Sequence, residues 1–293
     1  MSIGVPNKIK MKQKILIYGN CQTQAINGIV SSDYYDLEQI TCHTTEINEY
    51  TFKNKIQSAD VIITQPISDD YRGTKHLSLK FILDTVKVNS KIIVFPSLFG
   101  GCYYPDVIYH KDLFGNKVDT PCDYHYRTMI KYFLENKSQN QFTDEVVNNE
   151  NFMSTEEIDD FANSLLNRIE KSESTCKNRF PSIHLIRCAN FVKKEWKNKL
   201  LFYAINHGTK YMYQYVAENI NFLLNGKLNI NYEKDPHYNL NRHIVYSCVS
   251  EVLNFEMESD SALPSGVVGT KNVVNEYFTT YHKNNINWDI DKL

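Results

Sequence analysis

The sequence predicts an α/β fold, with an N-terminal parallel-sheet layer and a mostly helical C-terminal portion packed on it. Three observations predict it. Apolar runs of strand length alternate with helix-length segments through the first hundred residues, and after about residue 120 the pattern becomes mostly helical. Hydrophobic residues make up 42% and aromatic residues 13% of the 293 positions, enough for a sizeable core. We expect residues 1–120 and 121–293 to form two regions of one integrated domain.

Four short apolar runs are the predicted strands, at 14–19, 39–44, 60–67 and 91–96. Apolar residues at helical spacing occupy the segments 21–30, 46–59 and 74–86, with Thr74 as the N-cap of the third helix. This alternation produces a parallel sheet, and ligands bind beyond the carboxyl ends of its strands. The loops at 19–22, 65–72 and 96–106 leave those ends, so we expect them to converge on one cleft.

Capping residues and apolar spacing predict the elements of the second region. Pro121 opens one helix, and a capping box of Ser154 with Glu157 opens another. The stretch 137–151 is rich in Asn, Gln and Ser and is expected to be a loop. The other predicted elements are a helix at 183–196, a short strand or buried helix start at 200–205, a helix from Thr209 that stops at Gly226, and helices near 241–253 and 271–283.

Charge and cysteine content exclude several classes of protein. The formal net charge is -2, so the chain has no general basic field for nucleic acid. No segment resembles a signal peptide, and no window approaches the ~20 apolar residues of a membrane helix, so we expect a cytoplasmic protein. The seven cysteines include no C-x-x-C pair, so we expect free thiols and no metal site. Cys188 and Cys248 lie in apolar surroundings and are expected to fill the core.

The most informative stretch is Gly19-Asn20-Cys21-Gln22. Gly19 permits a sharp turn where the first strand ends, and Cys21 follows in the first turn of the next helix. Free N–H groups and the helix dipole favour an anion there, so we expect a thiolate-biased thiol with a pKa below about 8.5. The same N–H groups can hold an oxyanion or a phosphate, and the amides of Asn20 and Gln22 can orient a carbonyl. A tight turn around a buried structural cysteine is the alternative.

Two further residues carry candidate chemistry. His207 follows an apolar run and precedes a helix, where a histidine acts as a general base or only caps and packs. Arg72 follows the third strand, where it can clamp a phosphate or form an ion pair with Asp69 or Asp70.

The loop after the fourth strand offers a third group of candidates. Tyr103 and Tyr104 present flat surfaces for a ring, and Asp106 can orient a histidine as in a catalytic triad, unless the loop is only a surface turn. The sequence has no phosphate-binding G-x-x-x-x-G-K-S/T loop, no G-x-G-x-x-G after the first strand and no H-E-x-x-H. Nucleotide hydrolysis, a standard dinucleotide fold and zinc proteolysis are therefore disfavoured.

Taken in order along residues 14–225, these motifs resemble the WcbI family of capsular polysaccharide biosynthesis proteins. The shared features are Gly19-Asn20-Cys21-Gln22, Gln65-Pro66 with Asp70-Tyr71-Arg72-Gly73, Pro96-Ser97, Tyr104-Pro105-Asp106, and Asn206-His207 before a long helix. Two departures stand out. Gly208 follows His207 where the family usually has proline, and Tyr104 stands where a histidine or aromatic is common.

The resemblance implies acetyl transfer from acetyl-coenzyme A, as co-substrate, to a sugar hydroxyl of a surface polysaccharide or its precursor. Cys21, His207, Asn20 and Asp106 are the implied catalytic residues. The residues implied in coenzyme A binding are Gly19, Gln22, Gln65, Tyr71, Arg72, Tyr103, Tyr104 and Asn206. Peripheral association with capsule assembly machinery is also implied.

The strand–turn–nucleophile layout of this Rossmann-like sheet is also similar to that of SGNH hydrolases, with Cys21 where those enzymes place serine. Two alternatives therefore stand beside acetyl transfer. One is a cysteine-dependent esterase or deacetylase acting on polysaccharide, which would not need coenzyme A. The other is a non-catalytic, coenzyme A-binding component of a capsule assembly complex, which would bind without turnover.

Overall fold

The computed structural model describes residues 12–43, 46–109, 118, 121–256, 260–284, 286 and 288. These form two compact units. The first unit comprises the described residues up to 96 together with 175–186 and 214–232. The second comprises those of 97–174, 187–213 and 233 onward. Both units therefore draw on chain from before and after residue 120.

The first unit is built on a five-stranded parallel sheet of order β3-β1-β4-β5-β8. Its strands are β1 (Gln13–Gly19), β3 (Tyr35–Thr41), β4 (Val61–Thr64), β5 (Lys91–Val94) and β8 (His184–Leu185). The predicted α/β fold is confirmed, and each of the four predicted strands overlaps an observed one. The second strand begins four residues earlier than predicted, and β8, within the predicted helix 183–196, was not foreseen as a strand.

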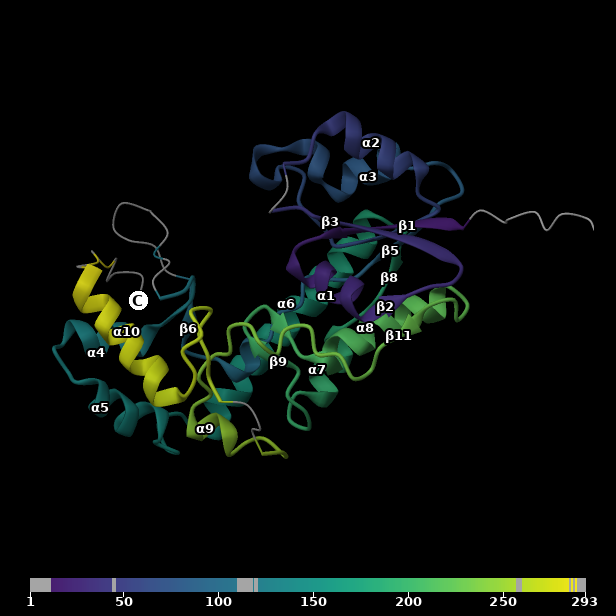
Figure 1. Cartoon of the computed structure of the whole chain (residues 1–293). Helices are drawn as coiled ribbons and strands as arrows, with labels where there is room; N and C mark the ends of the chain where they lie inside the picture. The colour runs from purple at the N-terminus through teal and green to yellow at the C-terminus, as the bar shows by residue number, and fades with distance from the viewer. Residues whose placement is uncertain are drawn as a thin grey trace, which may run out of the picture. The chain divides into compact units, whose positions relative to one another are not determined.

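Helices cover both faces of this sheet. Figure 1 shows α2 (Glu49–Ser58) and α3 (Leu79–Thr85) on one face and α1 (Cys21–Ile29) on the other. Side chains alternate along a strand, so Leu16 and Tyr18 of β1 pack into the core with Phe52 of α2. The rings of Tyr18 and Phe52 have centroids 4.6 Å apart.

The cap of α3 differs from the prediction. Thr74 does not cap it, because the chain makes two 3₁₀ turns at Tyr71–Gly73 and Lys75–Leu77 before the helix begins. The hydroxyl of Ser78 instead accepts the N–H of Phe81 at 3.1 Å. A smaller antiparallel pair, β2 (Val30–Ser31) with β11 (Asn229–Ile230), completes the strands of this unit.

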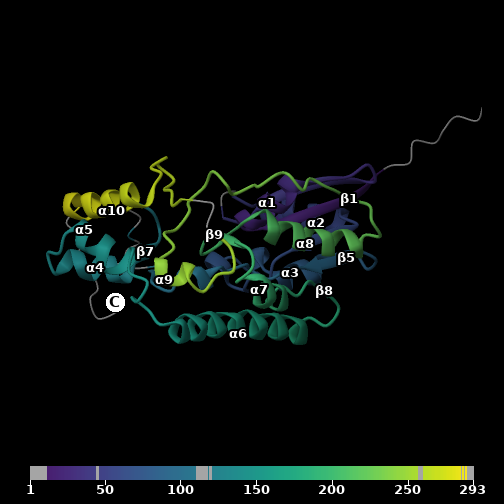
Figure 2. The ribbon, with the colours of Figure 1, turned by 90° about the horizontal axis from the view of Figure 1, so that it is seen from below.

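The second unit is mainly helical. Its helices are α4 (Arg127–Leu134), α5 (Gln139–Phe142), a π-helical turn (Thr143–Val147), α7 (Ala189–Glu195), α9 (Ser247–Ser250) and α10 (Thr270–Asn284), and the boundaries between the units fall within α6 (Thr155–Arg179) and α8 (Lys210–Leu223). Two short hairpins accompany them, β6 (Val107–Ile108) with β7 (His125–Tyr126) and β9 (Phe202–Ala204) with β10 (His207–Gly208). Figure 2 shows α10 beside α4 and α5.

Local capping signals in the second region are partly confirmed. The Ser154–Glu157 capping box is present, with contacts of 2.8–3.2 Å, and Gly226 follows α8 with a φ of 73°. The prediction of a helix that begins at Pro121 is wrong for its first residues. Residues 125–126 form the strand β7, which pairs with β6, and the helix α4 begins only at Arg127. The predicted loop at 137–151 instead contains α5, which opens with a capping box at Ser138. The helix predicted at 241–253 is only the four residues of α9.

Among the described residues, no helix combines the length and the apolar character needed to cross a membrane.

Candidate functional site

The order of the strands places a site at the end of β1. The chain passes from β1 to β3 on one side and then returns to β4 on the other side of β1. The connections after β1 and β4 therefore diverge, and a crevice at such a switch point is where ligands bind in open α/β sheets. The residues that follow these two strands are Asn20 and Gln65, so the predicted convergence of the loops at 19–22 and 65–72 is observed.

Gly19 is required because neighbouring side chains lie too close to its Cα to leave room for a Cβ. A Cβ at this position would lie 2.6 Å from Oε1 of Gln65 and 2.6 Å from Cγ2 of Thr23. Any other residue would therefore displace the Gln65 side chain or the first turn of α1. The glycine allows β1 to pass directly into the helix that carries Cys21.

Asn20 is the N-cap of α1. Its Oδ1 accepts the N–H of Gln22 at 2.9 Å, and its backbone carbonyl accepts both the N–H and the hydroxyl of Thr23, at 3.0 and 2.7 Å. The amide oxygen is thus committed to the helix. The Nδ2 group is the end of this side chain that could donate to an oxyanion.

Gln22 and Gln65 hold the turn together from inside. Gln65 Oε1 accepts the N–H of Asn20 at 3.0 Å, and Gln65 Nε2 donates to Gln22 Oε1 at 2.9 Å. Both side chains are buried, at 1% and 2% exposure. The expectation that these amides face a ligand is wrong for this structure, because they are bonded to each other across the switch point.

Cys21 has solvent access, whereas the other six cysteines are buried. Burial raises the pKa of the Cys21 thiol above its ordinary value. Hydrogen bonds from the backbone of Cys21 and Gln22 lower this pKa without offsetting the effect of burial. The expected thiolate bias is therefore wrong: the N–H groups do face the sulfur, but the resting form is the thiol. Cys188 and Cys248, at 0% and 2% exposure, fill the core as expected.

A second layer of side chains lies behind this turn. The N–H of Cys42 donates to the carbonyl of Gly19 at 2.7 Å, and Tyr71 hydrogen-bonds to the Cys42 sulfur. Arg72, in the left-handed region at φ 54°, donates from Nη1 to the carbonyl of His43 at 3.0 Å. Left-handed backbone at a residue other than glycine marks strain, which concentrates at functional loops.

The acidic neighbours of Arg72 do not pair with it. Asp69 forms an ion pair with Arg179 at 2.5 Å. The exposed guanidinium of Arg72 lies 5.7 Å from the ring centroid of Tyr71. Arg72 therefore presents an exposed cation on the 3₁₀ turn after β4, which fits the phosphate-binding role expected for it.

His207 lies in the second unit, on β10. Its Nδ1 is buried and accepts or donates no hydrogen bond, while the ring bonds to the backbone of Asn241. That bond is consequently made by Nε2, so Nδ1 carries the lone pair and has no hydrogen-bond partner inside the fold. Burial lowers the pKa of His207, and the bond to Asn241 opposes the shift only in part.

His237 and His243, which the sequence analysis did not single out, both interact with His207. The ring of His237 lies 4.8 Å from that of His207 between centroids, and its Nδ1 is 2.9 Å from the hydroxyl of Tyr213. The charge of His207 acts on both His237 and His243, and burial lowers the pKa of each to about 3. The Asp-Pro-His-Tyr loop that carries His237 was the available signal, but loop sequence alone does not reveal burial.

The loop at 96–106 does not supply the roles predicted for it. Tyr103 and Tyr104 are 0% and 2% exposed, so neither offers a flat surface to a ligand. The hydroxyl of Tyr104 donates to the carbonyl of Phe202 at 2.8 Å. Asp106 does not orient a histidine in the manner of a triad, because its carboxylate accepts from Thr128 at 2.9 and 3.1 Å and from the hydroxyl of Tyr246 at 2.7 Å.

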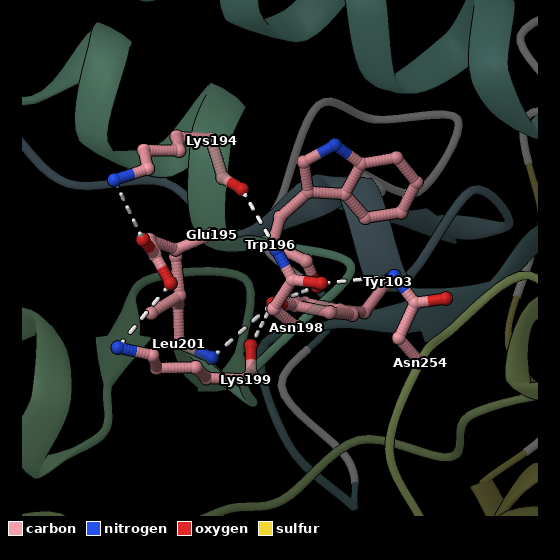
Figure 3. Close-up of polar contacts among 8 residues, drawn as sticks. All are labelled: Tyr103, Lys194, Glu195, Trp196, Asn198, Lys199, Leu201 and Asn254. Carbon is pink, nitrogen blue, oxygen red and sulfur yellow. Dashed lines mark hydrogen bonds and ion pairs between the residues drawn. The ribbon is translucent and has the colours of Figure 1, made fainter.

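Figure 3 shows what Tyr103 does instead. Its hydroxyl lies 2.8 Å from the carbonyl oxygens of both Trp196 and Lys199 and accepts the N–H of Leu201 at 3.2 Å. It therefore fixes the turn between α7 and β9. Asn206, also predicted at the site, lies in the tight connection between β9 and β10, next to His207.

Residues 14–225 match the family described as polysaccharide biosynthesis enzyme WcbI. The chain belongs to the WcbI family. The match spans β1, the Cys21 turn, both loops at the switch point and His207.

A solved structure of WcbI is similar in fold. It is described as a novel polysaccharide biosynthesis enzyme, in a native form without a disulfide bond between coenzyme A and one of its cysteines. The TM-score is 0.79 at 16% identity, over 94% of this chain and 91% of that one. A diflavin flavoprotein A3 from Nostoc sp. gives a TM-score of only 0.22 at 12% identity, over 30% of this chain and 60% of that one. Comparison with curated proteins found no match.

The described part of this WcbI-family chain contains no group of three or more His, Cys, Asp or Glu side chains arranged to hold a metal ion. The candidate groups that the structure describes are a thiol under N–H groups in the first unit and a buried imidazole in the second.

Proposed function

We propose that this WcbI-family enzyme transfers an acetyl group from acetyl-coenzyme A to a sugar hydroxyl of a surface polysaccharide or its precursor. One observation carries the proposal. The Cys21 sulfur lies at the N-terminus of α1, where the backbone N–H of Cys21 faces it together with that of Gln22, which also donates to the Asn20 cap. The same arrangement suits a thioester, whose carbonyl oxygen becomes an oxyanion when the carbon is attacked.

The loops at the switch point fit coenzyme A as co-substrate. Arg72 supplies an exposed guanidinium at the end of β4, suited to a phosphate. The solved WcbI structure is described in terms of a disulfide between coenzyme A and a cysteine, which supports a thiol of the family lying near the thiol of this cofactor. We propose Cys21 as the corresponding group here, because it is the cysteine with solvent access.

In the covalent form of the mechanism, Cys21 Sγ bonds to the acyl carbon and the thioester C–S bond breaks. Because the resting thiol is protonated, its proton must pass to a base, and coenzyme A leaves as the thiol after protonation. The sugar hydroxyl then attacks the acyl-enzyme, its proton passes to the base, and Cys21 is restored. In the direct form, the sugar hydroxyl attacks the acyl carbon of acetyl-coenzyme A itself and Cys21 forms no bond to the acyl group. His207 Nδ1 is then the proposed base, which takes the proton of the hydroxyl and returns it to the departing sulfur, so that coenzyme A leaves as the thiol.

The first experiment is isothermal titration of the purified full chain with coenzyme A. Saturable binding that weakens in Arg72→Ala supports the proposal. Absence of binding refutes it and favours the esterase or deacetylase alternative. Lys53→Ala, which removes an exposed cation from α2, is the matched control and should bind as the wild type does.

The second experiment follows transfer of radiolabelled acetyl from acetyl-coenzyme A to de-esterified polysaccharide from the cell that encodes the chain. His207→Gln should reduce kcat by about 10²–10⁴-fold, as loss of a general base does. His184→Gln, which changes an exposed histidine, should leave kcat unchanged. Binding of coenzyme A without transfer to any acceptor would instead favour the non-catalytic component.

Mass spectrometry decides between the two forms of the mechanism. An acetyl group trapped on Cys21 after rapid quenching supports the covalent form. Full activity in Cys21→Ala would eliminate it, whereas loss of activity without a trapped adduct favours the direct form.

A further inference from the structure

The second unit contains a pocket that none of the roles above uses. Its volume is about 700 Å³, within the ~300–1,000 Å³ of ligand-binding pockets. It is lined by the end of the turn fixed by Tyr103, by the start of α8 and by the loop that follows Glu233. The rings of Tyr203, Tyr211 and Tyr238 and the charged groups of Lys199, Lys210 and Asp235 all contribute to it.

We propose that this pocket is the acceptor subsite and binds an uncharged oligosaccharide segment of the growing polysaccharide. The proposal rests on the proposed function, since it names where the acceptor of that reaction is held. It goes beyond it by assigning residues to the binding of the acceptor.

The aromatic rings carry the first argument. Tyr211 and Tyr238 are 43% and 50% exposed, so a ligand in the pocket can reach both side chains. The faces of pyranose rings carry C–H groups that stack on aromatic faces, and phenol hydroxyls also exchange hydrogen bonds with sugar hydroxyls. Lys210 Nζ lies 5.6 Å from the ring centroid of Tyr211, and the Arg242 guanidinium lies 5.2 Å from that of Tyr238. These cations hold both rings in place without burying them.

The charges of the lining carry the second argument. Two lysines, Lys199 and Lys210, and two acids, Asp235 and Glu256, line the pocket, and Lys199 also forms an ion pair with Glu195 at 3.2 Å, so the lining has no excess of positive charge. A polyphosphate would meet two carboxylates here, whereas sugar hydroxyls can donate to carboxylates and accept from ammonium groups. Asp235 is held in position, because its Oδ2 accepts the hydroxyl of Tyr203 at 2.8 Å. A neutral chain with many hydroxyl groups can hydrogen-bond to both the lysine and the acidic side chains of the pocket, whereas an anion would be repelled by the acidic ones.

Connectivity to His207 carries the third argument. Tyr203 lies on β9, which pairs with the strand of His207 in register Ala204 to His207. In the other wall, Asp235 and Tyr238 line the pocket. His237, which lies between these two residues in the sequence, packs against the His207 ring. The two segments that form the pocket thus also form the surroundings of the imidazole.

The remaining wall is rigid. Asn198 and Lys199 line the pocket from the turn that the Tyr103 hydroxyl holds through the carbonyls of Trp196 and Lys199 (Figure 3). The amide of Asn254 donates to Asn198 Oδ1 at 2.9 Å. A pre-formed wall lowers the entropic cost of binding a flexible oligosaccharide.

The test uses surface polysaccharide of the cell that encodes the chain. Mild acid cleaves it, dilute base removes its esters, and monosaccharide and tetrasaccharide fractions serve as acceptors with acetyl-coenzyme A. Tyr211→Ala and Tyr238→Ala should each raise KM for the tetrasaccharide about tenfold, as loss of one stacked ring does, with kcat and the monosaccharide KM unchanged. Tyr211→Phe should retain most of the affinity because the ring remains. Tyr50→Ala, which removes a 74% exposed ring from α2, is the matched control.

The outcomes separate this inference from the proposed function. Equal changes in KM for both acceptors, or no change for either, would overturn the subsite while leaving acetyl transfer intact. If the wild type transfers acetyl to neither fraction, the proposed function fails, and saturation-transfer NMR with the same tetrasaccharide decides the pocket. Binding that is lost in both alanine variants supports it, and the absence of binding to the wild type refutes it.

Discussion

Substitution of Gly19 by alanine tests whether the turn after β1 is held as tightly as its contacts indicate. The added Cβ would lie 2.6 Å from both Gln65 Oε1 and Thr23 Cγ2, well inside van der Waals contact. Gln65 has little room to retreat, because it is 2% exposed and bonded to the N–H of Asn20 and the amide of Gln22. Relief of the clash must therefore break those bonds or shift α1.

The cost follows from these contacts. Forcing a methyl group into a packed site costs about 1–3 kcal/mol. Each of the two hydrogen bonds lost from Gln65 adds about 0.5–1.5 kcal/mol. We expect Gly19→Ala to lower the free energy of unfolding of the first unit by about 2–6 kcal/mol. In a Gln65→Ala background one obstacle is absent, so the same substitution should cost at least about 1 kcal/mol less.

Hydrogen exchange as a function of urea measures this cost in one unit. Amides of β1 and β4 lie in the middle of the sheet and exchange through opening of the first unit, which separates it from the second. Thr23→Ser, which keeps the hydroxyl but removes Cγ2, is a second way to relieve the clash. A cost below about 1 kcal/mol for Gly19→Ala, or an equal cost in the Gln65→Ala background, would refute the close packing described here.

Three further predictions concern titration and capping. Alkylation of Cys21 by iodoacetamide should show a midpoint above about pH 8.5, because burial raises its pKa, and a midpoint near pH 7 would contradict the assignment of a resting thiol. His237 and His243 stay neutral when folded, since burial lowers each pKa to about 3, whereas an unfolded histidine titrates near 6.5. The unfolded state therefore binds more protons, so the second unit should lose up to about 2 kcal/mol per histidine between about pH 6.5 and 5. Both tryptophans lie in that unit, so urea unfolding followed by their fluorescence measures the loss, and His243→Phe should reduce the pH slope. Ser78→Ala should destabilise the first unit by about 1 kcal/mol through loss of the α3 cap, whereas Ser58→Ala, at an exposed helix end, should cost less in the same exchange measurement.

Much of the candidate site was predictable because it depends on neighbours in the chain. An apolar run ending in glycine and followed by helical spacing predicts β1, the turn and α1, and parallel topology predicts that the loops after β1 and β4 meet. The Ser154–Glu157 capping box is likewise a local pattern, since its donors and acceptors are three residues apart. These features need only a few residues of sequence to be specified.

What required the tertiary structure was burial and the choice of distant partners. Tyr103 and Tyr104 are as suitable for a ligand as for a core until the packing of β9 and α7 encloses them. The pKa of Cys21 turns on a balance between N–H groups, which the sequence predicts, and desolvation, which depends on everything packed around the sulfur. The side-chain amide of Gln65 donates a hydrogen bond to Gln22, which is 43 residues away in the sequence. The contact between the rings of His237 and His207 likewise depends on how the loop of His237 packs. Whether a side chain is shielded from solvent depends on all the residues that pack around it, so burial can be read only from the folded chain.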